Sequence, residues 1–226
     1  MKRGKKYRER LNKVEQGKVY ALEEAIKQLR EINYADFDAT LEIAINLNIL
    51  QKHNVRDTVA LPHGTGKTVR IAVFAKAEKA KEAEAAGADF VGDADLIEKI
   101  KGGWFDFDVA VATPDMMKDV GKIGKLLGTR GLMPNPKAGT VTPNIKQTVE
   151  ELKKGRVEFR ADKTKIVHLG IGKLSMDDNA LIENCRSLYE GVLSKRPQDL
   201  KGDYIKSVYL SSTMSPGIQV DHKAIA

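Results

Sequence analysis

The strand-like segments of this chain follow two different hydrophobic patterns, and this contrast constrains the fold more than any other feature. In the middle of the sequence, residues 69–75 and 107–113 are short, mostly apolar runs. Such runs are typical of strands that are buried on both faces of a parallel sheet. Near both ends of the chain, apolar and polar residues alternate instead. Strict alternation indicates strands with one buried and one solvent-exposed face.

The middle of the chain predicts strands and helices in alternation. We expect strands over residues 69–75, 88–92 and 107–113, and helices over about residues 76–86, 93–101, 113–128 and 142–155. Thr113-Pro114 and Thr142-Pro143 both resemble helix starts, with a hydroxyl cap before a proline at the first helical position. The pattern predicts an α/β Rossmann-like three-layer domain, with helices on both faces of a small parallel sheet.

The two ends of the chain predict a different kind of sheet. In residues 40–48 the apolar residues Leu41, Ile43, Ile45 and Leu47 share one face. We expect further strands over residues 156–162, 164–172, 204–213 and 217–221, and helices near residues 21–32 and 177–195. A tight turn at Asp162-Lys163 should join the first two of these strands.

Neither end has enough strands for a stable sheet by itself. The economical solution is one α+β split domain, built from residues 1–67 and 159–226, that carries residues 68–158 as an inserted domain. Two crossings, near residues 67 and 159, would then join the domains through a short two-stranded neck and allow hinge-like opening.

The charge distribution favours an anionic partner. The net charge is +7, and residues 1–13 account for +6 of it. Tyr7 lies among these cations, and an aromatic ring can stack on a base, so the basic arm indicates nucleic acid rather than a membrane. A solvated tail is the alternative.

Composition also argues against several other classes of protein. The single cysteine, Cys185, excludes an internal disulfide and lies on a helical apolar stripe, where a buried inert thiol is expected. The four histidines lack the spacing of metal ligands, so no metal site is expected. No apolar run approaches the ~20 residues of a membrane span, and we expect a cytoplasmic protein.

Residues 128–140, GTRGLMPNPKAGT, predict an ordered loop between two helices. Three glycines and two prolines in thirteen residues exclude a regular helix or strand. Such a loop would present backbone N–H groups, Arg130 and Lys137 to an anion. A solvent-exposed turn without a partner is the alternative.

The segment GTGKT, Gly64 to Thr68, raises the alternative of a nucleotide hydrolase that uses Lys67. The phosphate-binding P-loop pattern, however, requires a glycine where this chain has Leu61. A P-loop also opens a helix, whereas a strand is expected directly after Thr68. We therefore interpret GTGKT as a glycine-rich neck.

No catalytic or cofactor site emerges from the rest of the chain. The dinucleotide fingerprint G-x-G-x-x-G is absent after the first middle strand. Asp106 and Asp108 share strand parity, but no nucleophile, base or metal ligand accompanies them. We expect no enzyme activity and no cofactor.

Two segments carry side chains suited to RNA. Phe37 can stack or pack against ribose, while Thr40 and Glu42 lie on the exposed face of the first strand and can hydrogen-bond to base amino groups and 2′-hydroxyls. In residues 204–216, a row of hydroxyls ends in an apolar tip: Ser207, Ser211, Thr213, Met214, Ser215. A buried Phe37 and an ordinary exposed strand edge are the alternatives.

Five segments together resemble one family across nearly the whole chain: DFDATLEIAINLNI, VRDTVALPHGTGKTVRIAVF, GTRGLMPNPKAGTVTPN, FRADKTKIVHLGIGK and SSTMSPG. Their order and spacing are similar to those of bacterial ribosomal large-subunit protein one, the stalk protein family. The resemblance implies a split α+β domain with an inserted Rossmann-like domain. It also implies a monomer that binds large-subunit ribosomal RNA at the mobile exit-site stalk.

The resemblance carries further implications for function. Family members assist the release of deacylated transfer RNA, and many repress translation by binding their own messenger. A free-standing messenger-binding repressor without ribosome residence is an alternative. The RNA-binding residues that the motifs imply are Phe37, Thr40, Glu42, Asp162, Lys163, Ser207, Ser211, Thr213 and Met214, together with Arg3 and Tyr7 in the basic arm. Arg130 and Lys137 would contact transfer RNA, ribosomal RNA or the other domain.

Three positions depart from the family pattern. Ser215 stands where the family usually has glycine, which would loosen a close RNA contact or add a hydrogen bond. Residues 48–51 replace a Gly-Ile-Asp-Pro type turn, and Thr129 replaces a proline.

Overall fold

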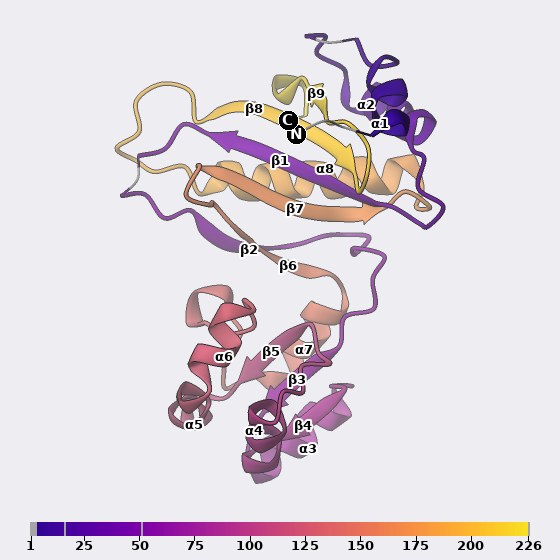
Figure 1. Cartoon of the computed structure of the whole chain (residues 1–226). Coiled ribbons are helices and arrows are strands. Elements are labelled where there is room, and N and C mark those ends of the chain that lie inside the picture. Colours follow the sequence, from indigo (N-terminus) through magenta and orange to yellow (C-terminus); the bar gives the residue numbers. More distant parts are fainter. Residues whose placement is uncertain (1–3, 16, 51, 226) are drawn as a thin grey trace. The chain divides into compact units, whose positions relative to one another are not determined.

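The computed structural model describes residues 4–15, 17–50 and 52–225, apart from the side chain of Ala77. The chain divides into two compact units (Figure 1). Unit 1 contains residues 1–67 and 157–226, and unit 2 contains residues 68–156. The second crossing thus lies two residues before the expected position. Independent folding of the two units stays a prediction.

Unit 1 is built around a four-stranded antiparallel sheet in the order β7-β1-β8-β9. Its elements are α1 (Lys5–Leu11), α2 (Leu22–Ile32), β1 (Thr40–Leu47), β2 (Arg56–Ala60), β6 (Arg156–Arg160), β7 (Ile166–Lys173), α8 (Asp178–Ser194), β8 (Ile205–Ser212), β9 (Ile218–Val220) and a short 3₁₀ helix His222–Ala224. The predicted alternation is present in β1, where Leu41, Ile43, Ile45 and Leu47 are all buried.

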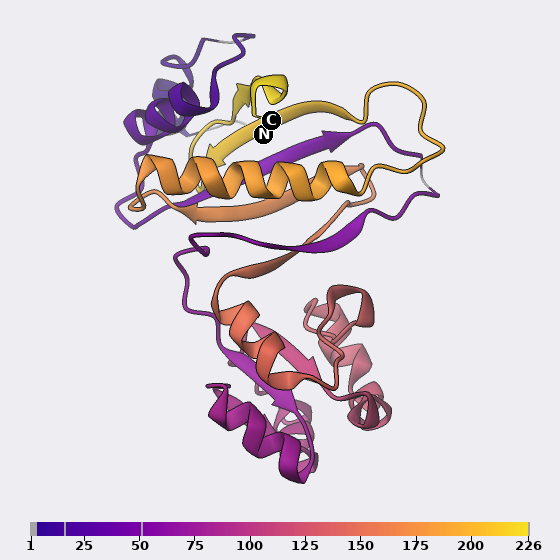
Figure 2. The same ribbon diagram turned by 180° about the vertical axis from the view of Figure 1, so that it is seen from behind.

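Helices α2 and α8 cover the buried face of this sheet. Helix α8 lies behind the sheet in Figure 1 and in front of it in Figure 2. Gly172 in β7 allows a close approach, because a Cβ atom there would lie 2.5 Å from Leu181 Cδ2 on α8. Within the described part of the chain, no helix is both long and apolar enough to cross a membrane.

The tight turn predicted at Asp162-Lys163 is present, with Asp162 N donating to Ile166 O at 2.9 Å, but the two strands that it joins do not form a hairpin. Strand β6 pairs with β2 in a separate two-stranded sheet, and only the bridge Ala161↔Val167 links this segment to β7. Strand β2 was not predicted, because its residues are half-buried and show no alternation. The long-range partner therefore decides the pairing of β6, and local sequence does not.

Unit 2 contains a three-stranded parallel sheet in the order β4-β3-β5. Its elements are β3 (Ile71–Phe74), α3 (Ala77–Ala85), β4 (Phe90–Gly92), α4 (Ala94–Lys101), β5 (Val109–Ala112), α5 (Met117–Lys122), α6 (Gly124–Thr129), α7 (Ile145–Lys153) and the short 3₁₀ helices Pro114–Met116 and Pro136–Ala138. All four residues of β3 are buried. Ala72 and Phe74 join one hydrophobic core, and Ile71 and Val73 join another. The sheet is therefore packed on both faces.

The predicted helix starts in unit 2 need correction. Thr113 makes no capping hydrogen bond, and the expected single helix is broken at Ile123, between α5 and α6. Helix α7 is preceded by Asn144 and not by Thr142, whose hydroxyl accepts a hydrogen bond from Asn144 N at 3.1 Å. Thr142 thus forms a short turn before the helix, which is a common alternative use of a threonine.

Candidate nucleic-acid interface

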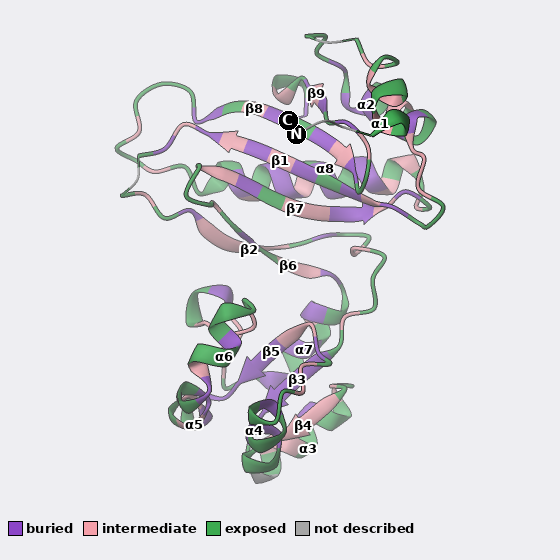
Figure 3. Cartoon of the chain, in the orientation of Figure 1, coloured by how far each residue is buried: buried purple, intermediate pink, exposed green. Residues whose placement is uncertain are grey.

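The face of the four-stranded sheet opposite α2 and α8 carries polar side chains from β1, β7 and β8. Figure 3 shows the alternation of buried and accessible residues along β1 and β8. Glu42 is exposed, while Thr40 and Asn46 are half-buried. Their side chains are directed away from the core because Leu41, Ile43 and Ile45 point into it. We call this surface the open face.

One end of the open face brings Thr40 together with Thr213 and Met214, three of the predicted RNA-binding residues. Thr40 N donates a hydrogen bond to Thr213 Oγ1 at 2.9 Å, and Tyr34 Oη donates to Met214 O at 2.9 Å. These bonds join two segments that are about 170 residues apart in the sequence. Phe37 is 56% exposed and Met214 is 51% exposed. The alternative of a buried Phe37 is therefore wrong.

The predicted strand residues continue along the sheet from this end. Glu42 lies between Gly170 of β7 and Ser211 of β8. Ser207 lies opposite Asn46, four residues further along β8, which corresponds to roughly 13 Å. The hydroxyl row predicted from sequence is thus spread along the strand and does not form one cluster.

The Asp162–Lys163 turn lies at the opposite end of the open face from Met214. Asp162 oxygens accept hydrogen bonds from Ile166 N at 2.9 Å and from Thr164 Oγ1 at 2.7 Å. These hydrogen bonds, first of all that from Ile166 N, lower the pKa of the Asp162 carboxyl. The carboxylate therefore organises the turn, whereas Lys163 is exposed. An RNA contact by either residue stays a prediction.

Ser215 closes the turn after β8. Its Oγ accepts a hydrogen bond from Ser212 N at 2.9 Å and donates to Pro216 O at 3.2 Å. The hydroxyl that distinguishes this position from the family's glycine is therefore engaged within the turn. Its effect on RNA binding stays a prediction.

Part of the basic arm is helical. Residues Lys5–Leu11 form helix α1, which buries no residue. Tyr7 belongs to this helix, which lies beside α2 in both views (Figures 1 and 2). Arg3 lies outside the described residues.

The Gly/Pro loop of unit 2 is ordered, as predicted, but its backbone does not face outward as expected. Asn135 N donates to Thr140 Oγ1 at 2.8 Å, and Lys137 N donates to Asn135 Oδ1 at 2.8 Å. The N–H groups of Gly139 and Thr140 also donate to carbonyls of the loop. These N–H groups donate to acceptors within the loop. Any anion would therefore have to bind to side chains of the loop and not to these backbone groups.

The two cationic side chains of this loop differ in their surroundings. The guanidinium carbon of Arg130 lies 3.8 Å from the centre of the Phe105 ring, in a cation–π arrangement. Lys137 is exposed on the short 3₁₀ helix Pro136–Ala138. Both side chains are therefore exposed, and Arg130 in addition contacts an aromatic ring.

The GTGKT segment is attached to α8 by a buried asparagine. Asn184 Nδ2 donates to Gly64 O at 2.8 Å and to Ile171 O at 2.9 Å, and Asn184 Oδ1 accepts from His63 N at 3.1 Å. Gly64 and Gly66 have positive φ angles, and strand β3 follows the segment. This geometry differs from a P-loop, which leads from a strand into a helix.

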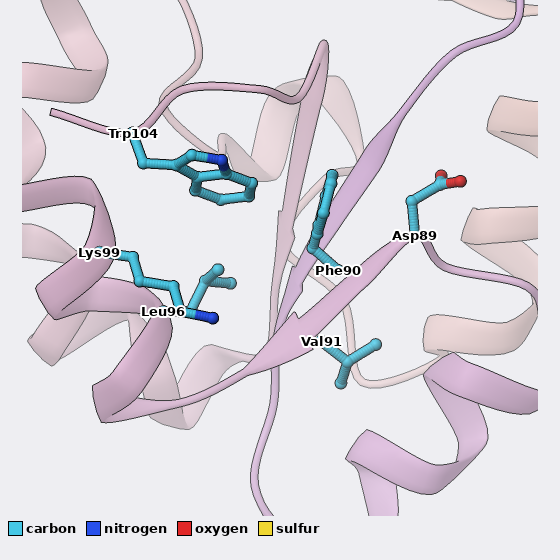
Figure 4. Close-up of a pocket in the computed structure, with 6 residues that line it drawn as sticks. All are labelled: Asp89, Phe90, Val91, Leu96, Lys99 and Trp104. Carbon is cyan, nitrogen blue, oxygen red and sulfur yellow. The ribbon is translucent and has the colours of Figure 1, made fainter.

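Two pockets of unit 2 bear on whether this unit binds a nucleotide. One, of about 490 Å³, is lined by Asp89, Phe90, Val91, Leu96, Lys99 and Trp104 (Figure 4). Its aromatic wall is formed by Phe90 and Trp104, whose ring centres are 4.6 Å apart. Asp89 Oδ2 accepts a hydrogen bond from Ile71 N at 2.9 Å and thereby supports the sheet. The wall lacks the Gly-rich phosphate cradle of a dinucleotide site.

The second pocket, of about 260 Å³, follows the carboxyl ends of the parallel strands, where doubly wound sheets bind their ligands. Here Asp93 caps α4 by accepting a hydrogen bond from Ala94 N. Asp119 accepts a hydrogen bond from Lys122 Nζ at 2.8 Å, and this bond is the main cause of its lowered pKa. The lining of this pocket therefore combines the carboxylates of Asp93, Glu98 and Asp119 with the lysines Lys76, Lys101 and Lys122.

The sequence did not identify two ring side chains on the open face. Tyr209 is 40% exposed, and the side chain of His168 is 63% exposed. Both lie opposite Ala44 of β1, one on each side. The parity that selects Ser207 and Ser211 also selects Tyr209, so this signal was available in the sequence.

The described ranges hold neither a cluster of metal-ligating side chains nor a reactive cysteine. No group of three or more His, Cys, Asp or Glu side chains there could hold a metal ion. Burial raises the pKa of the Cys185 thiol to about 12, which keeps it protonated and unreactive at neutral pH.

Comparison with known proteins gives a consistent assignment. Residues 29–216 match the model of the ribosomal protein L1p/L10e family. The large ribosomal subunit protein uL1 of Leptospira biflexa serovar Patoc is 52% identical over 225 residues, covering 100% of this chain and 98% of that protein. The protein of the same name from Borreliella afzelii is 54% identical over 220 residues, covering 97% of each chain.

Proposed function

The chain belongs to the ribosomal protein L1p/L10e family, and from this premise we propose that it is a structural, RNA-binding constituent of the large ribosomal subunit in the cytoplasm. The relatives are named as ribosomal proteins and not as enzymes. The observation that carries the proposal is the open face of unit 1. It presents hydroxyl, carboxylate and apolar groups in one plane.

The chemistry of the open face suits structured RNA. The 2′-hydroxyls and base edges of RNA helices are accessible in a wide, shallow minor groove, which a flat sheet can approach. Thr40, Glu42 and Ser211 supply donors and acceptors, and Phe37 and Met214 supply exposed apolar surface at one end. Lys163 supplies a cation at the other end.

We further propose the finer role that the resemblance implies. Unit 1 binds ribosomal RNA at the mobile exit-site stalk, and the protein assists the release of deacylated transfer RNA. The same face binds a similar structure in the protein's own messenger and represses translation. Lys137 of unit 2 is exposed and available for a transfer RNA contact.

The substitution Met214→Asp tests the RNA-binding assignment. Met214 is 51% exposed, so the variant should fold normally, while the new negative charge repels RNA phosphate. Affinity for a transcript of the stalk segment of Leptospira biflexa ribosomal RNA should fall at least tenfold, with an unchanged melting temperature. Leu126→Asp is the matched control, because it adds the same charge at a 42% exposed position of unit 2.

Normal affinity in a folded Met214→Asp variant would remove Met214 from the interface. Co-sedimentation with large subunits separates a ribosomal constituent from a free repressor, which would bind messenger but not subunits. Turnover of ATP or GTP that Lys67→Ala abolishes would revive the hydrolase alternative.

A further inference from the structure

One row of residues crosses all four strands in the middle of the open face. His168 of β7 lies opposite Ala44 of β1, Ala44 lies opposite Tyr209 of β8, and Tyr209 lies opposite Gln219 of β9. Directly opposite residues of an antiparallel sheet point to the same face. We call these four residues the central row.

The central row combines two accessible rings with a small residue between them. Two strand spacings separate the backbones of His168 and Tyr209, roughly 10 Å in all. Between them the side chain of Ala44 is a single methyl group, and the neighbouring position on β7 is Gly170. No large side chain therefore fills the space above the sheet between the two rings.

The Tyr209 ring is held in place at its outer end. Tyr209 Oη donates a hydrogen bond to Gln219 Oε1 at 3.3 Å, which ties the ring toward β9 and away from Ala44. On the other side, His168 Nε2 lies 3.9 Å from Asp162 Oδ2. A fixed aromatic ring loses little conformational entropy when a planar ligand stacks on it.

The surroundings of the row select the kind of ligand. The adjacent rows contain Glu42 with Ser211 on one side and Asn46 with Ser207 on the other. Lys206 is exposed beside Ser207, at the β-bulge of β1 and β8, and supplies a positive charge. Rings flanked by hydroxyl, amide and cationic groups on a four-stranded antiparallel sheet are suited to bases, ribose and phosphate of a single-stranded nucleotide.

We propose that the central row binds one unpaired nucleotide of the RNA, with its base stacked on Tyr209 above Ala44. This inference rests on the proposed RNA-binding function and adds a site within it. The stacked nucleotide lies between the two ends of the open face, so one continuous RNA segment contacts Met214, the central row and Lys163. Base stacking is tolerant of sequence, and the Glu42 and Asn46 rows supply hydrogen-bonding selectivity.

Two kinds of substitution test the site in the full-length protein. Tyr209→Leu removes the ring but keeps an apolar side chain, and Tyr209→Phe keeps the ring but loses the bond to Gln219. Ala44→Ile raises the surface between the rings without entering the core, and β-branched residues favour strands. Leu193→Ala is the control, because Leu193 is 42% exposed on α8, which covers the other face.

The measurements are RNA affinity, melting temperature and photocrosslinking with the Leptospira biflexa stalk transcript carrying 5-iodouridine. Tyr209→Leu and Ala44→Ile should each bind about tenfold more weakly than the unmodified protein. Their melting temperatures should lie within a few degrees of its melting temperature. Leu193→Ala should bind within twofold of the unmodified protein, and Tyr209→Phe, which keeps the ring but loses the bond to Gln219, should bind about two- to threefold more weakly. The main crosslink should map to Tyr209 and to a nucleotide that is unpaired in the transcript.

The outcomes separate this site from the broader proposal. Specific RNA binding that is unchanged by Tyr209→Leu and Ala44→Ile would overturn the stacking site and leave the RNA-binding function standing. A Tyr209→Phe variant as weak as Tyr209→Leu would also overturn it, because the hydroxyl and not the ring would then matter. If the unmodified protein shows no preference for the stalk transcript over a scrambled hairpin, the proposed function itself fails.

Discussion

The two units of this protein use their sheets in opposite ways. In unit 1, helices α2 and α8 cover one face of an antiparallel sheet, and the other face carries accessible polar and aromatic side chains. In unit 2, both faces of the parallel sheet are packed, and every residue of β3 is buried. Unit 1 can therefore bind a partner on a strand surface, whereas unit 2 can bind only through its loops and helices.

The same contrast applies to the polar groups of the two regions. On the open face, Glu42 is exposed, and no hydrogen bond to another part of the described chain is seen for its carboxylate. In the Gly/Pro loop of unit 2, most backbone donors and the Thr140 hydroxyl bond to other groups of the loop. The hydrogen bonds within the loop thus account for its glycine- and proline-rich sequence. That sequence does not by itself imply a site for an anion.

The largest expected effect concerns the segment that leads from unit 1 into unit 2. Asn184→Leu should lower the free energy of unfolding by about 3 kcal/mol or more, because Gly64 O, Ile171 O and His63 N would each lose a buried partner at about 1–3 kcal/mol. Urea unfolding followed by far-UV circular dichroism measures this loss. Lys67→Ala, in the same segment, should cost much less. Equal losses in both variants would contradict the assignment of Asn184 as the anchor.

A smaller effect is expected from the Gly/Pro loop. Gly139 has a φ angle of 67°, and an added Cβ would lie 2.6 Å from Arg156 Nη2. Gly139→Ala should therefore destabilise unit 2 by about 1–2 kcal/mol. The single tryptophan, Trp104, lies in unit 2, so its fluorescence during urea unfolding reports this change.

The control for this substitution is Gly121→Ala in α5, where the added Cβ meets no atom within 4 Å. It should be neutral or stabilising, since alanine favours a helix over glycine. Affinity for the stalk RNA should stay within twofold in both variants. A tenfold loss of affinity in Gly139→Ala would place part of the RNA site in unit 2 and weaken the contrast between the units.

The smallest effect on affinity is expected from removing unit 2 altogether. Replacement of residues 68–155 by a Gly/Ser linker keeps β6 intact, and closing a loop costs free energy that varies slowly with its length. The truncated protein should fold cooperatively and retain specific RNA affinity within about twofold of the intact protein. A well-folded truncation without specific affinity would show that unit 2 carries the principal site.

The spacing of hydrophobic residues in the sequence predicted many of the strands in this structure. The alternation in residues 40–48 identified β1 and its buried face, and the apolar runs identified β3 and β5, because these patterns depend on local burial alone. It was harder to predict which strands pair with each other. The strand over residues 156–162 was predicted and corresponds to β6, but its partner β2 has no clear period and lies about 100 residues away in the chain, so no local signal identified β2 or the pairing.

The candidate site was predicted to a similar degree. Strand parity and family motifs selected Thr40, Glu42, Ser211 and Met214, which the structure places along one face. Tyr209 and His168 were overlooked, because a ring in an alternating strand is equally consistent with an ordinary exposed position. Only the register between β7, β1 and β8 shows that both flank Ala44.

Hydroxyl-radical footprinting of the intact protein tests the central claim most directly, because it compares both units in one molecule. Phe37 and Met214 on unit 1 and Leu126 on unit 2 are all exposed and open to oxidation in the free protein. With saturating stalk transcript, oxidation of Phe37 and Met214 should fall several-fold, while oxidation of Leu126 stays unchanged. A scrambled hairpin at the same concentration should give weaker protection. Protection of Leu126 with unchanged oxidation of Phe37 and Met214 would contradict the assignment of RNA binding to the open face.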